Sequence, residues 1–238
     1  MKIFAISDLH LSLDPRIEKP MDAFGDRWVN HVERLEANWR DAIGPEDLVL
    51  LPGDLSWGLR LEEAMADIRF IDALPGTKVL VKGNHDLWWT ARSHLQPLSD
   101  RLYFLQNDCL DTGDGVVICG SRGWICPGSE GFDEHDEKIF RRECMRLEMS
   151  LQAAKALGPR RIIACLHYPP TNDKHQGSAL TDLLTKYQVE TCVYGHLHGP
   201  DVFPKGLQGV LGGVTYRLVS LDYLEAKPLC LLDTAEEV

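Results

Sequence analysis

The chain has 238 residues, of which 44% are hydrophobic, and its formal net charge at pH 7 is −11. This proportion of apolar residues is sufficient for a sizeable core, whereas an acidic chain without clustered Lys and Arg does not attract nucleic acid through counterion release. No apolar stretch approaches the ~20 residues needed to cross a bilayer, so we expect neither nucleic acid nor a membrane as a partner.

The seven cysteines are an odd number without a C-x-x-C pair, and several lie inside apolar runs. Such thiols pack as small hydrophobic groups, so neither a disulfide framework nor a zinc knuckle is indicated. The first residues lack the long apolar region and cleavage site of a signal peptide, which predicts a cytoplasmic location. No linker or repeat divides the chain, and we therefore expect one domain over residues 1–238.

Short apolar runs without alternation recur along the chain and predict buried strands of a covered sheet. They lie at residues 3–6, 48–51, 79–81, 162–166 and 191–194. Apolar side chains at three- and four-residue steps predict helices between these strands, one carrying Val32, Leu35, Trp39 and Ile43, and a second that follows Asp54. This alternation of strand and helix favours parallel pairing with right-handed crossovers.

The pattern changes after Asn84. A helical piece at 87–95 is expected to give way to short strands near 102–105 and 116–120, and the longest helix to run over about 136–157. After His198, segments 202–204, 214–221 and 229–232 favour an antiparallel meander. An α/β fold with two sheets and helices outside accommodates all of these elements.

Polar residues directly follow the predicted strands. They are Asp8-Leu9-His10, Gly53-Asp54, Gly83-Asn84-His85-Asp86, His167 and Gly195-His196-Leu197-His198. In open α/β sheets ligands gather beyond the carboxyl ends of the strands. Each motif is weak alone, because a lone histidine or a Gly-Asp turn is common, but the ordered set indicates a site with two metal ions.

Carboxylate oxygens and imidazole nitrogens suit manganese, iron(II), zinc or magnesium, whereas the absence of thiolates disfavours a structural zinc site. Capping of strand ends is the alternative role for Asp8 and Asp54. When two carboxylates are buried so close to each other, they need a cation or a proton. Two ions roughly 3.5 to 4 Å apart would hold a bridging hydroxide for in-line attack at phosphorus, and Asp54, on the middle strand, is best placed to bridge them. The resulting excess of positive charge favours an anionic substrate.

The ordered set resembles the calcineurin-like metallophosphoesterases, whose pattern is D-x-H, G-D, G-N-H-D/E, H and G-H-x-H. The resemblance covers essentially the whole chain and implies a four-layer α-β-β-α sandwich of two mixed sheets with flanking helices. It implies that one ion is held by Asp8, His10, Asp54 and His198, and the other by Asp54, Asn84, His167 and His196. It also implies that His85 protonates or stabilises the leaving oxygen, with Asp86 orienting its ring.

At several positions the chain departs from the pattern of an individual subfamily, and these departures narrow the set of subfamilies that it resembles. Trp57 stands where purple acid phosphatases have a tyrosine ligand, and indole cannot replace phenolate. Segment 53–58 lacks the arginine of protein Ser/Thr phosphatases, and Asp86 replaces their glutamate. Lipid A pathway hydrolases share the opening Asp-Leu-His-Leu but usually have arginine where His85 stands. Segments 83–86 and 167–170 look closer to small-molecule phosphodiesterases.

We therefore expect a metal-dependent phosphoric ester hydrolase that acts on a phosphodiester or a small phosphorylated metabolite. Its cofactors are expected to be two divalent ions, manganese and/or iron, with zinc, nickel or magnesium as alternatives. A catalytically weak metal-binding scaffold and a nuclease remain as other functions. A scaffold need not keep His85 and Asp86, and a nuclease of this superfamily usually adds a basic surface.

Three loops, 11–28, 122–134 and 168–178, are expected to rim the metals. They and their neighbours offer Arg16, Arg122 and Lys174 as phosphate partners, and Trp57, Trp88, Trp89 and Trp124 as stacking faces. Packing or solvation is the alternative role for each of these side chains.

Overall fold

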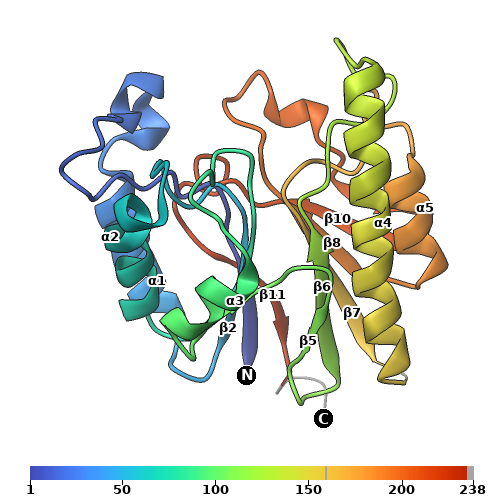
Figure 1. Ribbon diagram of the computed structural model, residues 1–238, viewed down its shortest axis with the longest axis horizontal. Helices are drawn as coiled ribbons and strands as arrows, with labels where there is room; N and C mark the ends of the chain where they lie inside the picture. The colour runs from blue at the N-terminus through green and yellow to red at the C-terminus, as the bar shows by residue number, and fades with distance from the viewer. Residues whose placement is uncertain (159, 235–238) are drawn as a thin grey trace. The chain divides into compact units, whose positions relative to one another are not determined.

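The computed structural model describes residues 1–158 and 160–234, which fall into two compact units (Figure 1). The first unit comprises Met1–Phe104 and the C-terminal segment that starts at Val219, and the second comprises Leu105–Leu218. The single domain expected over 1–238 stays a prediction, and it includes residues 159 and 235–238, which lie outside the described residues.

The first unit contains a five-stranded sheet in the order β11-β1-β2-β3-β4. Strands β1 to β4 pair in parallel, and β11 pairs with β1 in the antiparallel sense. Every residue of β2 is buried, as expected for a central strand of a parallel sheet. The strands are β1 Lys2–Ala5, β2 Leu48–Pro52, β3 Thr77–Val81, β4 Leu102–Phe104 and β11 Leu229–Asp233.

Two helices, α1 (His31–Ala42) and α2 (Leu61–Ala73), cover this sheet (Figure 1). The apolar stripe expected from the sequence is buried in both, and Trp39 of α1 is fully enclosed while its indole N–H donates to the Pro75 carbonyl at 2.9 Å. Shorter elements are α3 Arg92–Leu95 and the 3₁₀ turns Met21–Phe24, Asp26–Trp28 and Gln96–Leu98. Of the helix expected over 87–95, only residues 92–95 are thus helical.

The second unit contains a six-stranded sheet in the order β5-β6-β7-β8-β10-β9, with four parallel strands between antiparallel edges. Helices α4 (Glu134–Ala156) and α5 (Ala179–Lys186) lie side by side along it (Figure 1). The strands are β5 Cys109–Asp111, β6 Val116–Ser121, β7 Arg161–Leu166, β8 Thr191–Tyr194, β9 Gly209–Leu211 and β10 Val214–Leu218. A 3₁₀ turn spans Phe203–Lys205.

The expected α/β fold of two mixed sheets with flanking helices is confirmed. The expected antiparallel meander after His198 is wrong. Strand β10 pairs in parallel with β8, and β11 joins the sheet of the first unit. The reason is the crossover formed by residues 199–208, which reverses the chain before the β9–β10 hairpin begins. Among the described residues, no helix is long and apolar enough to span a membrane.

Asp67 of α2 is fully buried and ties the helix to the loops that follow β1 and β2. Its carboxylate accepts hydrogen bonds from the backbone N–H of Leu13, at 2.8 Å, and from the hydroxyl of Ser56. Burial raises the pKa of Asp67 from 3.8 to about 6, although both hydrogen bonds act in the opposite direction. Ionising this group in the folded protein therefore costs more than ionising it in the unfolded chain.

This raised pKa predicts a fall in stability between about pH 4 and pH 6, because the unfolded chain loses its proton first. The full effect of Asp67 is about 3 kcal/mol at most and is constant above the folded pKa. In Asp67→Asn the fall should be smaller by that amount, as measured by urea unfolding across this pH range. Glu62→Gln, an exposed change on the same helix, is the matched control. Parallel pH profiles for wild type and Asp67→Asn would contradict the assignment.

Candidate metal centre

In the first unit, Asp8 and His10 follow β1 and lie beside the loop that follows β2. The backbone N–H of Asp8 donates to the Gly53 carbonyl at 2.9 Å, and that of His10 donates to the Asp54 carbonyl at 3.0 Å. Asp8, His10 and Asp54 have positive φ values of 58°, 46° and 53°. Left-handed backbone is costly for residues other than glycine, and such strain clusters at functional sites.

The side chains of this group converge on Asp54. Its Oδ2 lies 3.9 Å from Nε2 of His10 and 4.0 Å from Nε2 of His85, and the ligand atoms of Asp8 and His10 lie within 4.8 Å of each other. A separation of 3.9 Å is too long for a hydrogen bond, but it suits two ligands whose bonds to one ion are about 2.0–2.2 Å. Asp8 and Asp54 are 0% and 1% exposed, whereas the His85 side chain is 44% exposed.

Asp86 holds the backbone of this site. Its carboxylate accepts hydrogen bonds at 2.8–3.3 Å from the backbone N–H groups of Asp54, Leu55, Ser56 and Gly83 and, at 3.0 Å, from the indole of Trp88. These bonds fix the loop that carries Asp54, and the expectation that Asp86 orients the ring of His85 stays a prediction. Complete burial and the nearby charge of Asp54 raise the pKa of Asp86.

Gly83 allows this loop to approach closely. A Cβ at position 83 would lie 2.0 Å from Oδ1 of Asp54 and 2.2 Å from its backbone nitrogen. The backbone N–H of His85 donates to the same Oδ1 at 2.8 Å, which leaves Oδ2 on the side of His10. Asn84, which stands between Gly83 and His85 in the sequence, is half-buried. The glycine of the G-N-H-D motif is thus required by packing against the aspartate.

Aromatic rings frame the histidines of the first unit. The ring of Trp57 stacks on His10 with centroids 4.8 Å apart and lies 4.5 Å from His85. The hydroxyl of Ser7 donates to the Asp8 carboxylate, a contact that no motif of the sequence indicated. The expectation of stacking faces at Trp88 and Trp89 is wrong, because they are only 1% and 7% exposed. Each is packed into the core, where an apolar ring after a strand is most often found.

In the second unit, the histidines lie on neighbouring strand ends. His167 follows β7 and is fully buried, and His196 follows β8 with a φ of 72°. Their ring centroids are 5.1 Å apart, and their ligand atoms lie within 4.8 Å of each other. Tyr168 packs on His196 at 4.1 Å, and half-buried His198 lies two residues further along the same loop. This unit therefore brings together two of the three expected ligands and places the third beside them in sequence.

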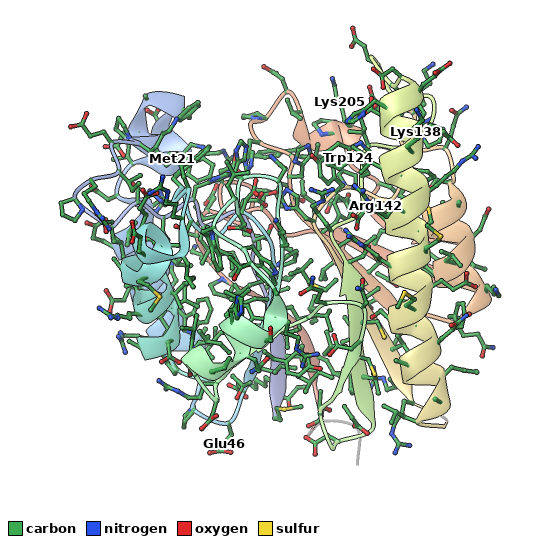
Figure 2. All side chains as sticks on the ribbon, viewed as in Figure 1. Met21, Glu46, Trp124, Lys138, Arg142 and Lys205 are labelled. Atoms are coloured by element: carbon green, nitrogen blue, oxygen red, sulfur yellow. The ribbon has the colours of Figure 1, made fainter. Side chains whose placement is uncertain are left out.

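The charged and aromatic rim residues are largely engaged by the protein. Arg16 pairs with Asp14 at 2.7 Å, and the guanidinium of Arg122 lies 4.5 Å from the ring centroid of Trp124. The Trp124 indole donates to Asp136 at 3.0 Å. Figure 2 labels Trp124 and Lys205, which lie at the same end of the second unit. Arg16 and Arg122 thus make contacts within the protein, and their role as phosphate partners stays a prediction.

The donor set fits divalent ions that prefer oxygen and imidazole ligands. The first unit supplies buried carboxylates with a histidine at a ligand-like distance, and the second supplies a pair of adjacent imidazoles. All seven cysteines are free, and the sequence motifs include none of them. The residue chemistry therefore matches manganese, iron, zinc or magnesium and does not select one of them.

The family model of the calcineurin-like phosphoesterases matches residues 1–200. Similar solved structures include the phosphopantetheinyl hydrolase of Mycobacterium tuberculosis, with 16% identity, a TM-score of 0.57 and coverage of 97% of this chain and 95% of that chain. A protein of unknown function from Aquifex aeolicus has 17% identity, a TM-score of 0.51 and coverage of 96% and 95%. These likenesses concern the fold. No curated protein matches the chain.

The chain belongs to the calcineurin-like phosphoesterase family. It is accordingly a metal-dependent phosphoester hydrolase, and its structure contains groups of histidines and aspartates that could hold a metal ion.

The close approach at Gly83 predicts that Gly83→Ala displaces Asp54 and weakens metal binding. Because a Cβ would clash with backbone as well as side chain, we expect a loss of about 1–3 kcal/mol or more in unfolding free energy. Thermal unfolding and elemental analysis of protein purified without chelator measure the two effects. Gly44→Ala is the control, since its Cβ would make an ordinary contact at 3.5 Å. Full metal content and unchanged stability in Gly83→Ala would contradict this account.

Proposed function

We propose that the ligand sets of the two units act together as one dinuclear centre, within a single domain over residues 1–238. One ion would be held by Asp8, His10, Asp54 and His198, and the other by Asp54, Asn84, His167 and His196. The observation that carries this proposal is the approach of buried His10 to within 3.9 Å of the buried Asp54 carboxylate, in a chain whose family match runs through both units. Bound divalent ions would supply Lewis acidity and an activated water for attack at phosphorus.

The charge of the ligands supports a phosphate ester as substrate. Asp8 and Asp54 bring about two negative charges, against about four positive charges from two divalent ions. A pocket with this balance attracts an anion even though the whole chain carries a net charge of −11. We therefore propose a phosphodiester or small phosphorylated metabolite, rather than a nucleic acid, as the substrate class. We propose manganese and/or iron as the metals.

His85 is the candidate general acid of this reaction. Its ring is close to Asp54, with 4.0 Å between Nε2 and Oδ2, yet its side chain is the most exposed of the group, so it can reach a bound ester. Trp57 packs against the ring and limits its rotation. His85 would donate a proton to the leaving oxygen, and Asp86 would act indirectly as a positioning residue for Asp54.

Activity should depend on the metal. Protein stripped with chelator should not hydrolyse bis(p-nitrophenyl) phosphate or p-nitrophenyl phosphate, and reloading with a divalent ion should restore turnover of at least one of them. Manganese, iron(II), nickel, zinc and magnesium are compared by release of p-nitrophenolate. Binding of metal without turnover of either ester under any of these ions would contradict the enzymatic proposal and indicate a scaffold.

Replacing His85 should slow catalysis without removing metal. His85→Ala is expected to lower kcat by about 10²–10⁴-fold, since a general acid typically contributes that much. The loss should grow with the pKa of the leaving alcohol, because poorer leaving groups need the proton more. Exposed His94→Ala is the matched control. Metal loss in His85→Ala, seen by elemental analysis, would instead make this residue a ligand.

A further inference from the structure

Cys109 and Cys119 stand directly opposite each other on the antiparallel strands β5 and β6 of the second unit (Figure 1). Residues that are opposite in this way project from the same face of a sheet. The thiol of Cys119 donates to the Ser150 carbonyl of α4 at 3.5 Å, so this face is the one that α4 covers. Cys119 is fully buried, whereas Cys109, on the edge strand, is half-buried. One sulfur of the pair can therefore be reached from solvent.

The hydrogen bonds of the hairpin show which kind of pair the two cysteines form. The backbone N–H of Thr112 donates to the Val116 carbonyl at 3.0 Å and closes the hairpin. Hydrogen-bonded and non-hydrogen-bonded pairs alternate along antiparallel strands. The cysteines, three positions further along the register, are therefore a non-hydrogen-bonded pair. The Cα atoms of such pairs are about 4.5 Å apart, within the range of about 4.4–6.8 Å that a disulfide spans.

Ser150 confirms this alternation from the other end of the strand pair. The backbone N–H of Gly120 donates to the Ser150 hydroxyl at 2.9 Å, and this hydroxyl donates to the Asp108 carbonyl. Asp108 and Gly120 occupy the position of the next hydrogen-bonded pair, and the serine hydroxyl stands between their backbone groups. The register of the cysteines is thus fixed on both sides, by the hairpin bond and by the serine.

A second pair of cysteines shows that neighbouring strands alone are not sufficient. Cys165 on β7 is in register with Val193, and Cys192 on β8 is in register with Ala164. This offset of one residue places the two sulfurs on opposite faces of the sheet. Cys165 and Cys192 are also fully buried, so an oxidant in solution does not reach them. The pair on β5 and β6 has both the register and the access that these residues lack.

Both thiols of the hairpin pair ionise less readily than a free cysteine. Burial, with a smaller contribution from the neighbouring Cys109 thiol, raises the pKa of Cys119 to about 12. Burial and the charges of Asp108 and Asp111 raise the pKa of Cys109. The thiolate is the nucleophile, and a thiol of high pKa is also a poor leaving group, so exchange at either sulfur is slow. A bond between these sulfurs would therefore be a lasting cross-link rather than a catalytic disulfide.

We propose that Cys109 and Cys119 are a modification site, at which a low-molecular-weight disulfide such as glutathione disulfide oxidises the pair to a cross-strand disulfide. The thiol of half-buried Cys109 loses its proton, and its sulfur attacks one sulfur of the oxidant and expels a thiolate. Cys119 then loses its proton, and its sulfur displaces the second thiolate from Cys109. The two thiolates take up the two protons. Two protein thiols are thus oxidised while one disulfide is reduced to two thiols, and no metal is needed.

The cross-link should form between these two residues in the full chain. Reduced protein is incubated with glutathione disulfide and chelator at mildly alkaline pH, and the remaining thiols are blocked by alkylation after unfolding. Digestion after Lys and Arg and before Asp separates the two cysteines, which lie in fragments 108–110 and 114–122. Mass spectrometry should find these two fragments joined. Cys230→Ser, which removes an exposed thiol of the first unit, is the matched control and should give the same link.

Oxidation should also stabilise the protein. A disulfide that closes a short loop restricts the unfolded chain, and we expect the melting temperature to rise by about 5–10 °C. Reduction should reverse this rise. The rise should be absent in Cys109→Ser and in Cys119→Ala and should persist in Cys230→Ser. Cys109→Ser changes a half-buried side chain on an edge strand, so its reduced form should melt close to reduced wild type.

Three outcomes would overturn the proposal. They are glutathione adducts without a link between the two fragments, a link from either residue to another cysteine, and a link that leaves the melting temperature unchanged. None of these outcomes bears on the phosphoesterase activity, because the exchange and its readouts are measured in chelator.

Discussion

The carboxylate of Asp86 is the constraint on which the geometry of the first unit depends. Four backbone N–H groups and one indole N–H point at it, and those of Asp54 and Leu55 belong to the loop that carries the central candidate ligand. Burial opposes the charge of this group, as its raised pKa shows, while the hydrogen bonds favour it. A carboxylate held in this way couples the loop after β3 to the loop after β2. The backbone of Asp54 is consequently held by its hydrogen bond to Asp86, and its Oδ1 is held by the bond that it accepts from the backbone N–H of His85.

This coupling explains how the site sustains strained backbone. Asp8, His10, Asp54 and His196 all adopt positive φ, at a cost of order 1–3 kcal/mol each. Such conformations persist only where the surroundings determine them, and here hydrogen bonds link the loops after β1 and β2 directly. The strain turns each side chain away from the path of a continuing strand and into the space at the end of the sheet. The positions of the candidate ligands are thereby fixed by the fold itself, and preformed positions reduce the reorganisation that binding of an ion would need.

The sequence signal for the candidate ligands is local, and it predicted their places at strand ends, while their role as ligands stays a prediction. Each follows an apolar run, and parallel strands bring such ends to one edge. Features that depend on contacts between distant segments could not be predicted. They are the burial of Trp88, the hydrogen bonds of Asp86 to the backbone, and the parallel pairing of β10. Glycine was informative only in part: Gly83 was predicted as part of a motif, but its contact with Asp54 was not.

In the second unit the sheet positions the histidines, whereas loops form the cavity beside His196. His167 and His196 stand on the ends of β7 and β8, where the sheet holds them rigidly, and their positions depend little on the loops beyond. The cavity walls come from segments 125–130, 169–173 and 197–205, which are joined through Asn172 and His175. Substitutions in those walls can change the shape of the cavity without displacing a strand end. The cavity and the histidines can therefore vary independently, because the sheet holds His167 and His196 while the loops that meet at Asn172 hold the cavity.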